Sequence, residues 1–176
     1  MSKTDINPLG SAIQIFKQYQ KLGLDAMNQL DTDGINWSPE PESNSIAVIV
    51  KHLHGNMKSR WTDFLTTDGE KPWRERDAEF VSDKPSKEFV LNQYNEGWDI
   101  LYNALRPLVQ TDLSKIITIR TEEHSVLEAI NRQIAHYSYH VGQIVYLAKA
   151  VQSESWKSLS IPKNKSGEFN KEMKHL

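Results

Sequence analysis

Hydrophobic residues recur at helical spacing in four stretches of the chain, and polar links that contain proline or glycine separate these stretches. Apolar side chains at positions i, i+3, i+4 and i+7 line one face of an amphipathic helix. The pattern therefore predicts helices over residues 8–30, 44–66, 86–108 and 125–151. The second of them has the clearest apolar stripe, which consists of Ile46, Ile49, Val50, Leu53, Met57, Trp61, Phe64 and Leu65.

The longest link lies between the second and third predicted helices. Residues 66–85 are rich in charge and include Trp73, which we expect to act as an apolar anchor. Such a long link is unusual in a compact bundle, and links of this kind are often functional. A shorter link before the fourth helix contains Ile116, Ile117 and Ile119, which predict a short extended piece or a tight hairpin.

Four long helices with little strand predict an all-α fold, namely a four-helix bundle. The long link permits a crossover between helices 2 and 3 in place of a simple up-and-down arrangement. We expect residues 1–152 to form the bundle domain and residues 153–176 to form a C-terminal tail that packs on it. The few apolar residues of this tail are Trp156, Leu159, Ile161 and Phe169.

Composition limits the class of protein. The chain has 176 residues, 38% of them hydrophobic and 25% charged, which is typical of a soluble globular domain. A net charge of −2 gives no reason to expect nucleic-acid binding. No run of about 18 apolar residues predicts a membrane span, and the first residues lack the apolar core of a signal peptide. Cysteine is absent, so a cytoplasmic location is expected, and any metal ligand must be His, Asp, Glu or backbone oxygen.

The fourth predicted helix has no charged residue from Gln133 to Ala148. A helix without charge over this length is expected to be covered on most sides. Small residues at Ala135, Ser138 and Gly142, on the side away from its main apolar stripe, favour the close approach of another helix. A symmetry-related copy would supply that helix, so a homodimer is expected.

The same helix contains the segment HYSYH, in which His136 and His140 stand four residues apart. Residues at this spacing lie on one face of a helix, so their two imidazoles can share one metal ion, as in many helical zinc sites. No glutamate follows the first histidine to act as a general base. The alternative is that both histidines are hydrogen-bonded residues of the core.

A catalytic metal site commonly has three protein ligands and one open position. The second helix offers His52 and His54, which are two residues apart and therefore point to different sides. The helical pattern alone does not choose between them, although His52 shares its side with polar residues such as Asn56. We expect His124 to belong to a helix cap and His175 to be solvated in the tail.

These motifs carry a resemblance to a known family. SIAVIVKHLHGNM, followed much later by HYSYHVGQI, resembles the DinB/YfiT-like superfamily, and DGEKPWRERD and SLSIPKNKSGEFN resemble a branch known mainly as uncharacterised proteins. The resemblance covers most of the chain and implies a DinB-like four-helix bundle with a crossover link, often dimeric. It also implies a divalent metal site with three ligands, His52, His136 and His140, whereas His54 matches no ligand position.

Three neutral imidazoles leave a divalent ion its full charge and open positions. We expect Zn or Ni, although ligand type alone does not choose the metal. The resemblance implies a metal-dependent hydrolase that acts on an unknown small molecule, and Asp63 is the single helical carboxylate near His52 that we expect as a base.

Two other functions stay open. Some members of the superfamily resemble S-transferases that use a low-molecular-weight thiol, and Lys71, Arg74 and Arg76 would then hold a carboxylate of that thiol. The third hypothesis is a stress-related dimeric bundle that acts by binding another protein and has no enzymatic activity.

Overall fold

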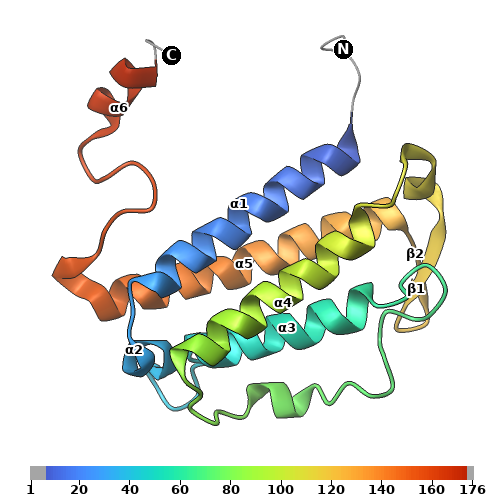
Figure 1. The fold of residues 1–176 in the computed structure, drawn as a ribbon, viewed down its shortest axis with the longest axis horizontal. Coiled ribbons are helices and arrows are strands. Elements are labelled where there is room, and N and C mark those ends of the chain that lie inside the picture. The colour runs from blue at the N-terminus through green and yellow to red at the C-terminus, as the bar shows by residue number, and fades with distance from the viewer. Residues whose placement is uncertain (1–6, 174–176) are drawn as a thin grey trace.

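A bundle of four long helices forms the body of the computed structural model, which describes residues 7–173 (Figure 1). This confirms the predicted all-α four-helix bundle with its crossover link. The long helices are α1 (Pro8–Asn28), α3 (Ile46–Trp61), α4 (Lys87–Leu105) and α5 (Val126–Gln152). The shorter elements are α2 (Thr32–Asn36), the 3₁₀ turns η1 (Asp77–Phe80), η2 (Gln110–Ser114) and η3 (Ser153–Ser155), the strands β1 (Ile116–Ile119) and β2 (Glu122–Ser125), and α6 (Ser166–Met173).

Serine residues cap the N-termini of α3 and α5, the two helices that carry the candidate site residues. The hydroxyl of Ser45 accepts a hydrogen bond from the backbone N–H of Val48 at the start of α3. At the start of α5, Ser125 and Glu128 form a reciprocal capping box. These bonds satisfy backbone donors that would otherwise have no partner in the first turn.

The second predicted helix is too long at its C-terminal end. Helix α3 stops at Trp61, Thr62 is extended, and Asp63 has a positive φ of 48°. Phe64 nevertheless stays buried, with its ring centroid 5.2 Å from that of Trp61. The apolar spacing at Phe64 therefore indicates contact with the core without helical backbone, whereas Leu65, which continues the same spacing, is 39% exposed.

The crossover lets α3 and α4 run in the same direction, because the intervening segment returns along α3 to the end of the bundle where α3 began (Figure 1). This segment is tied to the hairpin of β1 and β2. The carboxylate of Asp68 accepts hydrogen bonds from the backbone N–H groups of Arg120 and Thr121, and the N–H of Gly69 donates to the carbonyl of Thr118. Trp73 is 50% exposed, so the prediction that it anchors the link is wrong.

An aromatic cluster fixes the packing of three of the long helices. Phe16 of α1, Trp98 of α4 and Tyr137 of α5 are fully buried, with ring centroids 5.7–6.1 Å apart. The hydroxyl of Tyr137 donates to Asn56 Oδ1 and accepts from the indole N–H of Trp61, both on α3. Since Tyr137 lies inside HYSYH, its burial turns the neighbouring histidines toward the side of α5 that faces α3.

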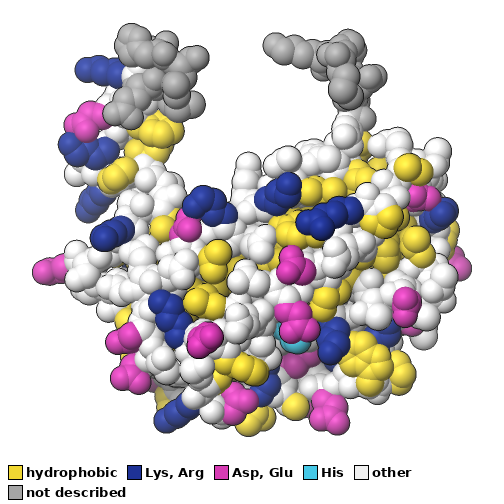
Figure 2. Space-filling model, in the orientation of Figure 1, with side chains coloured by type: hydrophobic (Ala, Val, Ile, Leu, Met, Phe, Trp, Pro, Cys, Tyr) yellow, Lys and Arg dark blue, Asp and Glu magenta, His cyan; other side chains and the backbone are white. Residues whose placement is uncertain are grey.

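The C-terminal segment contacts the bundle in its first part only. Trp156 and Leu159 are partly buried against the core, whereas Ile161 and Phe169 are exposed. Helix α6 projects from the bundle and shows hydrophobic side chains on its surface (Figure 2). Packing of residues 153–176 as a tail stays a prediction; residues 1–6 and 174–176, including His175, lie outside the described residues.

Candidate metal centre

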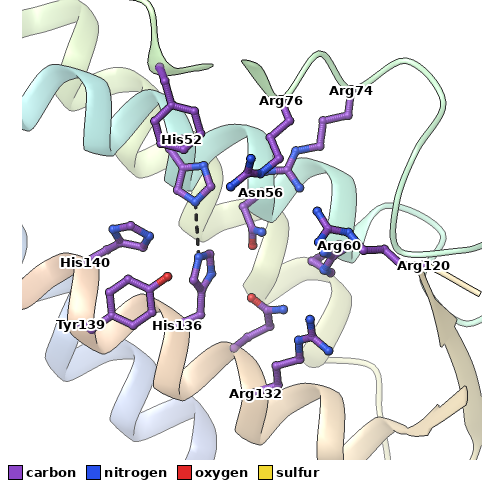
Figure 3. A pocket seen from close by; sticks show the side chains of 12 residues that line it. His52, Asn56, Arg60, Arg74, Arg76, Arg120, Arg132, His136, Tyr139 and His140 are labelled. Carbon is purple, nitrogen blue, oxygen red and sulfur yellow. Dashed lines mark hydrogen bonds between the residues drawn. The ribbon is translucent and has the colours of Figure 1, made fainter. Parts of the chain in front are cut away.

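Three histidines meet between α3 and α5. His52 of α3 and His136 and His140 of α5 each place one ring nitrogen within 4.8 Å of those of the other two. The Nε2 atoms of His52 and His136 are 3.3 Å apart. Figure 3 shows the three rings directed toward one another at one end of a pocket.

The outer nitrogens of two of these rings are already hydrogen-bonded. Nδ1 of His52 lies 2.9 Å from a carboxylate oxygen of Glu79, and Nδ1 of His140 lies 2.8 Å from the amide oxygen of Gln143. These oxygens are acceptors, so each Nδ1 carries the proton and each Nε2 keeps a free lone pair. Nε2 of His140 is buried and has no hydrogen-bond partner among the described residues.

Burial keeps the imidazoles of His136 and His140 neutral. It lowers the pKa of His136 to about 3, and repulsion from protonated His140 and His52 acts in the same direction. Burial also lowers the pKa of His140 to about 4, although its hydrogen bond to Gln143 opposes this shift. Neutral imidazole is the form that binds a metal ion.

Glu79 lies behind His52 and belongs to η1 in the crossover link. Burial opposes its ionisation, but hydrogen bonds from His52 and from the guanidinium of Arg74 outweigh burial and lower the pKa of Glu79. Gly55 of α3 makes room for this carboxylate, because a Cβ at position 55 would lie 2.2 Å from Oε1 of Glu79. Glu79 was not predicted from the sequence. The one local sign of a close neighbour at this point of α3 is the helical glycine three residues after His52.

The pocket beside the histidines has a volume of about 240 Å³. The ring of Phe80 packs against His52 with their centroids 4.9 Å apart, and Tyr139 lies against His136 and His140. The side chain of Asn56 reaches the middle of the pocket (Figure 3). The far end is lined by arginines, among them Arg74 and Arg76, which the sequence analysis singled out.

Several other candidates from the sequence lie elsewhere. Asp63, the expected base, follows the end of α3 and does not line the pocket. Lys71 is buried against Thr67 and Asp68, outside the pocket. Nε2 of His54 faces Glu96 of α4 at 3.2 Å, and His124 lies on β2, close to Glu122. None of these residues joins the histidine cluster.

Comparison with known protein families identifies the family of this chain. The family described as "Protein of unknown function (DUF1572)" matches residues 5–165. The chain belongs to this family. A comparison with curated proteins gives no match.

The fold of this DUF1572 protein is similar to that of a solved structure. It is YfiT from Bacillus subtilis, described as a probable metal-dependent hydrolase with an unusual four-helix bundle topology. The TM-score is 0.65 at 16% identity, and the match covers 89% of this chain and 94% of YfiT. At this identity the likeness shows the fold, and with the family match it confirms the assignment to the DinB/YfiT-like superfamily.

The three histidines of this DUF1572 protein could hold a metal ion. Two nitrogens bound to one tetrahedral Zn²⁺ at about 2.0–2.1 Å stand roughly 3.3 Å apart, which is the separation between His52 and His136. The buried, unpartnered Nε2 of His140 is the kind of atom that an ion would satisfy. The donor set therefore fits a divalent metal of borderline softness.

Proposed function

We propose that His52, His136 and His140 bind one divalent metal ion, Zn or Ni, and that the protein is a metal-dependent enzyme acting on a small molecule. The observation that carries the proposal is the free, buried Nε2 of His140, directed with His52 and His136 toward one point. A divalent ion bound there would act as a Lewis acid and lower the pKa of a water or thiol that it binds.

Metal content tests this proposal directly. Untagged protein should contain about one divalent ion per chain by plasma mass spectrometry, and His136→Ala and His140→Ala should each lose it. His54→Ala is the matched control, because His54 is on the same helix as His52 but faces Glu96. Absence of metal from the parent protein after incubation with Zn and Ni would contradict the proposal and leave a non-enzymatic interaction protein.

Hydrolysis of a small molecule is the first candidate reaction, and the description of the YfiT structure supports it. None of the described residues that line the pocket is acidic, and Glu79 is engaged by His52 and Arg74. The protein's own part would then be to orient the substrate. Burial raises the pKa of Tyr139, so its hydroxyl stays protonated and able to donate a hydrogen bond, while the Asn56 amide faces the pocket from the other side.

Thiol S-transfer is the second candidate, and the same lack of a pocket carboxylate favours it. A metal-held thiol needs no protein base to become a thiolate. The two reactions differ in what they consume. In water enriched in heavy oxygen, a hydrolase incorporates the label into its product. A transferase instead forms a bond between the thiol sulfur and the substrate, the leaving group departs with the thiol proton, and the product carries no label.

The exposed side of α5 supports the proposal of a homodimer. Tyr139 and Tyr146 are 53% and 73% exposed, and a Cβ at Gly142 between them would meet nothing within 4 Å. Large exposed aromatic side chains beside a small residue suit a close helix contact. Light scattering should give the mass of a dimer for the parent protein and of a monomer for Tyr146→Arg; a monomeric parent protein would contradict the proposal.

A further inference from the structure

The pocket beside the histidines has a strongly cationic far end. Five arginines line it, and they come from four separate segments of the chain (Figure 3). They are Arg60 of α3, Arg74 and Arg76 of the crossover link, Arg120 of the hairpin turn and Arg132 of α5. Because these arginines are far apart in the sequence, no single sequence motif predicts the concentration of positive charge that they form in the fold.

Only part of this charge is neutralised by the protein. Glu79 pairs with Arg74, while Glu70 lies within ion-pair distance of Arg60 and Arg120. Both carboxylates lie outside the set of side chains that line the pocket.

Two of the five arginines, which form the exposed rim of the pocket, have no acidic partner in the described part of the chain to neutralise their charge. Arg76 and Arg132 have no carboxylate within ion-pair distance among the described residues. Arg76 instead places its guanidinium 5.2 Å from the centre of the Phe80 ring, next to the histidine end. Both side chains are exposed at the rim, where an anion from solution can reach them.

Two of the other arginines, Arg60 and Arg74, have buried side chains behind this rim, whereas the side chain of Arg120 is half exposed. The side chains of Arg60 and Arg74 are only 5% and 2% exposed. Burying a cation is costly unless anions or acceptors surround it, and Arg60 Nε has no partner among the described residues. A bound anion would lower this cost, and the low-dielectric wall strengthens its attraction.

We propose that the pocket binds a small organic dianion, either a phosphate monoester or a dicarboxylate, with its charged end at Arg76, Arg120 and Arg132 and its reacting end at the histidines. Two unneutralised guanidinium groups match a double negative charge, and the planar guanidinium fork suits both oxyanions. A volume of about 240 Å³ is below the range typical of drug-sized ligands, which restricts the ligand to small metabolites.

This inference names the substrate class of the proposed enzyme, and its reactive end rests on the proposed function. The arginine end can be tested without metal. Isothermal titration calorimetry on metal-free protein at low ionic strength would use inorganic phosphate, malonate and acetate as probes. The variants are Arg76→Gln and Arg132→Gln, with Arg106→Gln as the control, because Arg106 is an exposed arginine at the end of α4 outside the pocket.

We expect saturable binding of phosphate or malonate and no saturable binding of acetate. Each pocket variant should weaken binding about tenfold, as expected for loss of a charge-assisted hydrogen bond, and Arg106→Gln should leave it unchanged. Phosphate binding alone would identify the monoester, and malonate binding alone the dicarboxylate. Binding of neither dianion, or equal weakening by Arg106→Gln, would overturn the inference.

The metal and anion sites can fail separately. Protein that takes up no Zn or Ni but binds a dianion through Arg76 and Arg132 would uphold the cationic pocket and contradict the metal centre. Protein that binds metal through its histidines but binds neither probe would uphold the metal centre and overturn the dianion. His140→Ala should abolish metal uptake and retain binding of inorganic phosphate, because position 140 is about two turns of α5 from Arg132 and lies at the opposite end of the pocket from Arg120 (Figure 3).

Discussion

Glu79 accepts a hydrogen bond from Nδ1 of His52 across 2.9 Å. The same carboxylate binds the guanidinium of Arg74, so a single residue of the crossover link fastens that link to α3 at the candidate metal centre. A carboxylate behind a metal-binding histidine fixes the orientation of the ring and its tautomer. The link therefore does more than return the chain to the start of α4.

Replacement of Glu79 by alanine should weaken metal binding by 10–100-fold, in keeping with the loss of such an outer hydrogen bond. His52 would lose the acceptor that holds its proton on Nδ1, and Arg74 would lose its counter-charge. Competition against a chromogenic chelator measures the change in affinity. Glu75→Ala is the control, since Glu75 is exposed in the same link; equal affinities of the two variants would contradict the role assigned to Glu79.

Gly55→Ala should disturb the same contact from the side of α3. The added methyl carbon would lie 2.2 Å from Oε1 of Glu79, so the carboxylate must move away from His52. We expect a loss of about 1–3 kcal/mol in the free energy of unfolding together with weaker metal binding. Gly167→Ala is the control, because the added methyl group would meet nothing within 4 Å and the position is on α6, outside the proposed dimer face of α5; this variant should leave the free energy of unfolding unchanged. Urea unfolding that ranks both variants alike would refute this account.

Tyr137→Phe should destabilise the fold by roughly 1–3 kcal/mol, because it leaves two buried polar groups without a partner. These are the indole N–H of Trp61 and Oδ1 of Asn56, which bond to the Tyr137 hydroxyl at 3.0 and 3.1 Å. Thermal unfolding of Tyr19→Phe serves as control, since Tyr19 is on α1, outside both this hydrogen-bond network and the proposed dimer face of α5. A melting temperature for Tyr137→Phe equal to that of the control would show that this network contributes nothing.

The stability of the metal-free protein should fall as the pH falls below about 6.5. In the fold, burial lowers the pKa of His136 to about 3 and of His140 to about 4, from an ordinary value of 6.5. Between these values the unfolded chain binds protons that the folded chain does not bind, so acid favours unfolding. This part of the stability is fully present above pH 6.5 and is lost as the pH falls toward the folded pKa values.

Urea midpoints measured from pH 7 to pH 4.5 test this pH dependence. The double variant His136→Asn, His140→Asn removes both groups, so its midpoint should change less over the same range. An equally steep fall in the double variant would assign the acid sensitivity to other groups.

Local sequence predicted the helices because their signals act within a few residues. The apolar stripe of each long helix needs no distant partner to be recognised. The Ser45 cap and the Ser125–Glu128 capping box seen in the structure are local in the same way. The error at the end of α3 arose because Phe64 keeps the helical spacing while Asp63 leaves the helix. Periodicity reports which side chains are buried, and an extended segment can bury a side chain as well.

The sequence by itself determined that His136 and His140 share one face of a helix, since i and i+4 spacing is a property of the helix alone. The helical pattern did not decide whether His52 or His54 is the third ligand, and the resemblance to a family favoured His52. Packing decided between them, because the rotation of α3 in the bundle directs His52 toward α5 and His54 toward Glu96 of α4.

The positions of Glu79 and of the pocket arginines beside the histidines could not be predicted from local sequence, because they too depend on tertiary packing. They come from the crossover link, α3, the hairpin turn and α5, and long-range contacts that minimise exposed apolar surface bring them together. Such contacts depend on the path of the whole chain, so the tertiary structure alone decided which charges surround the three histidines.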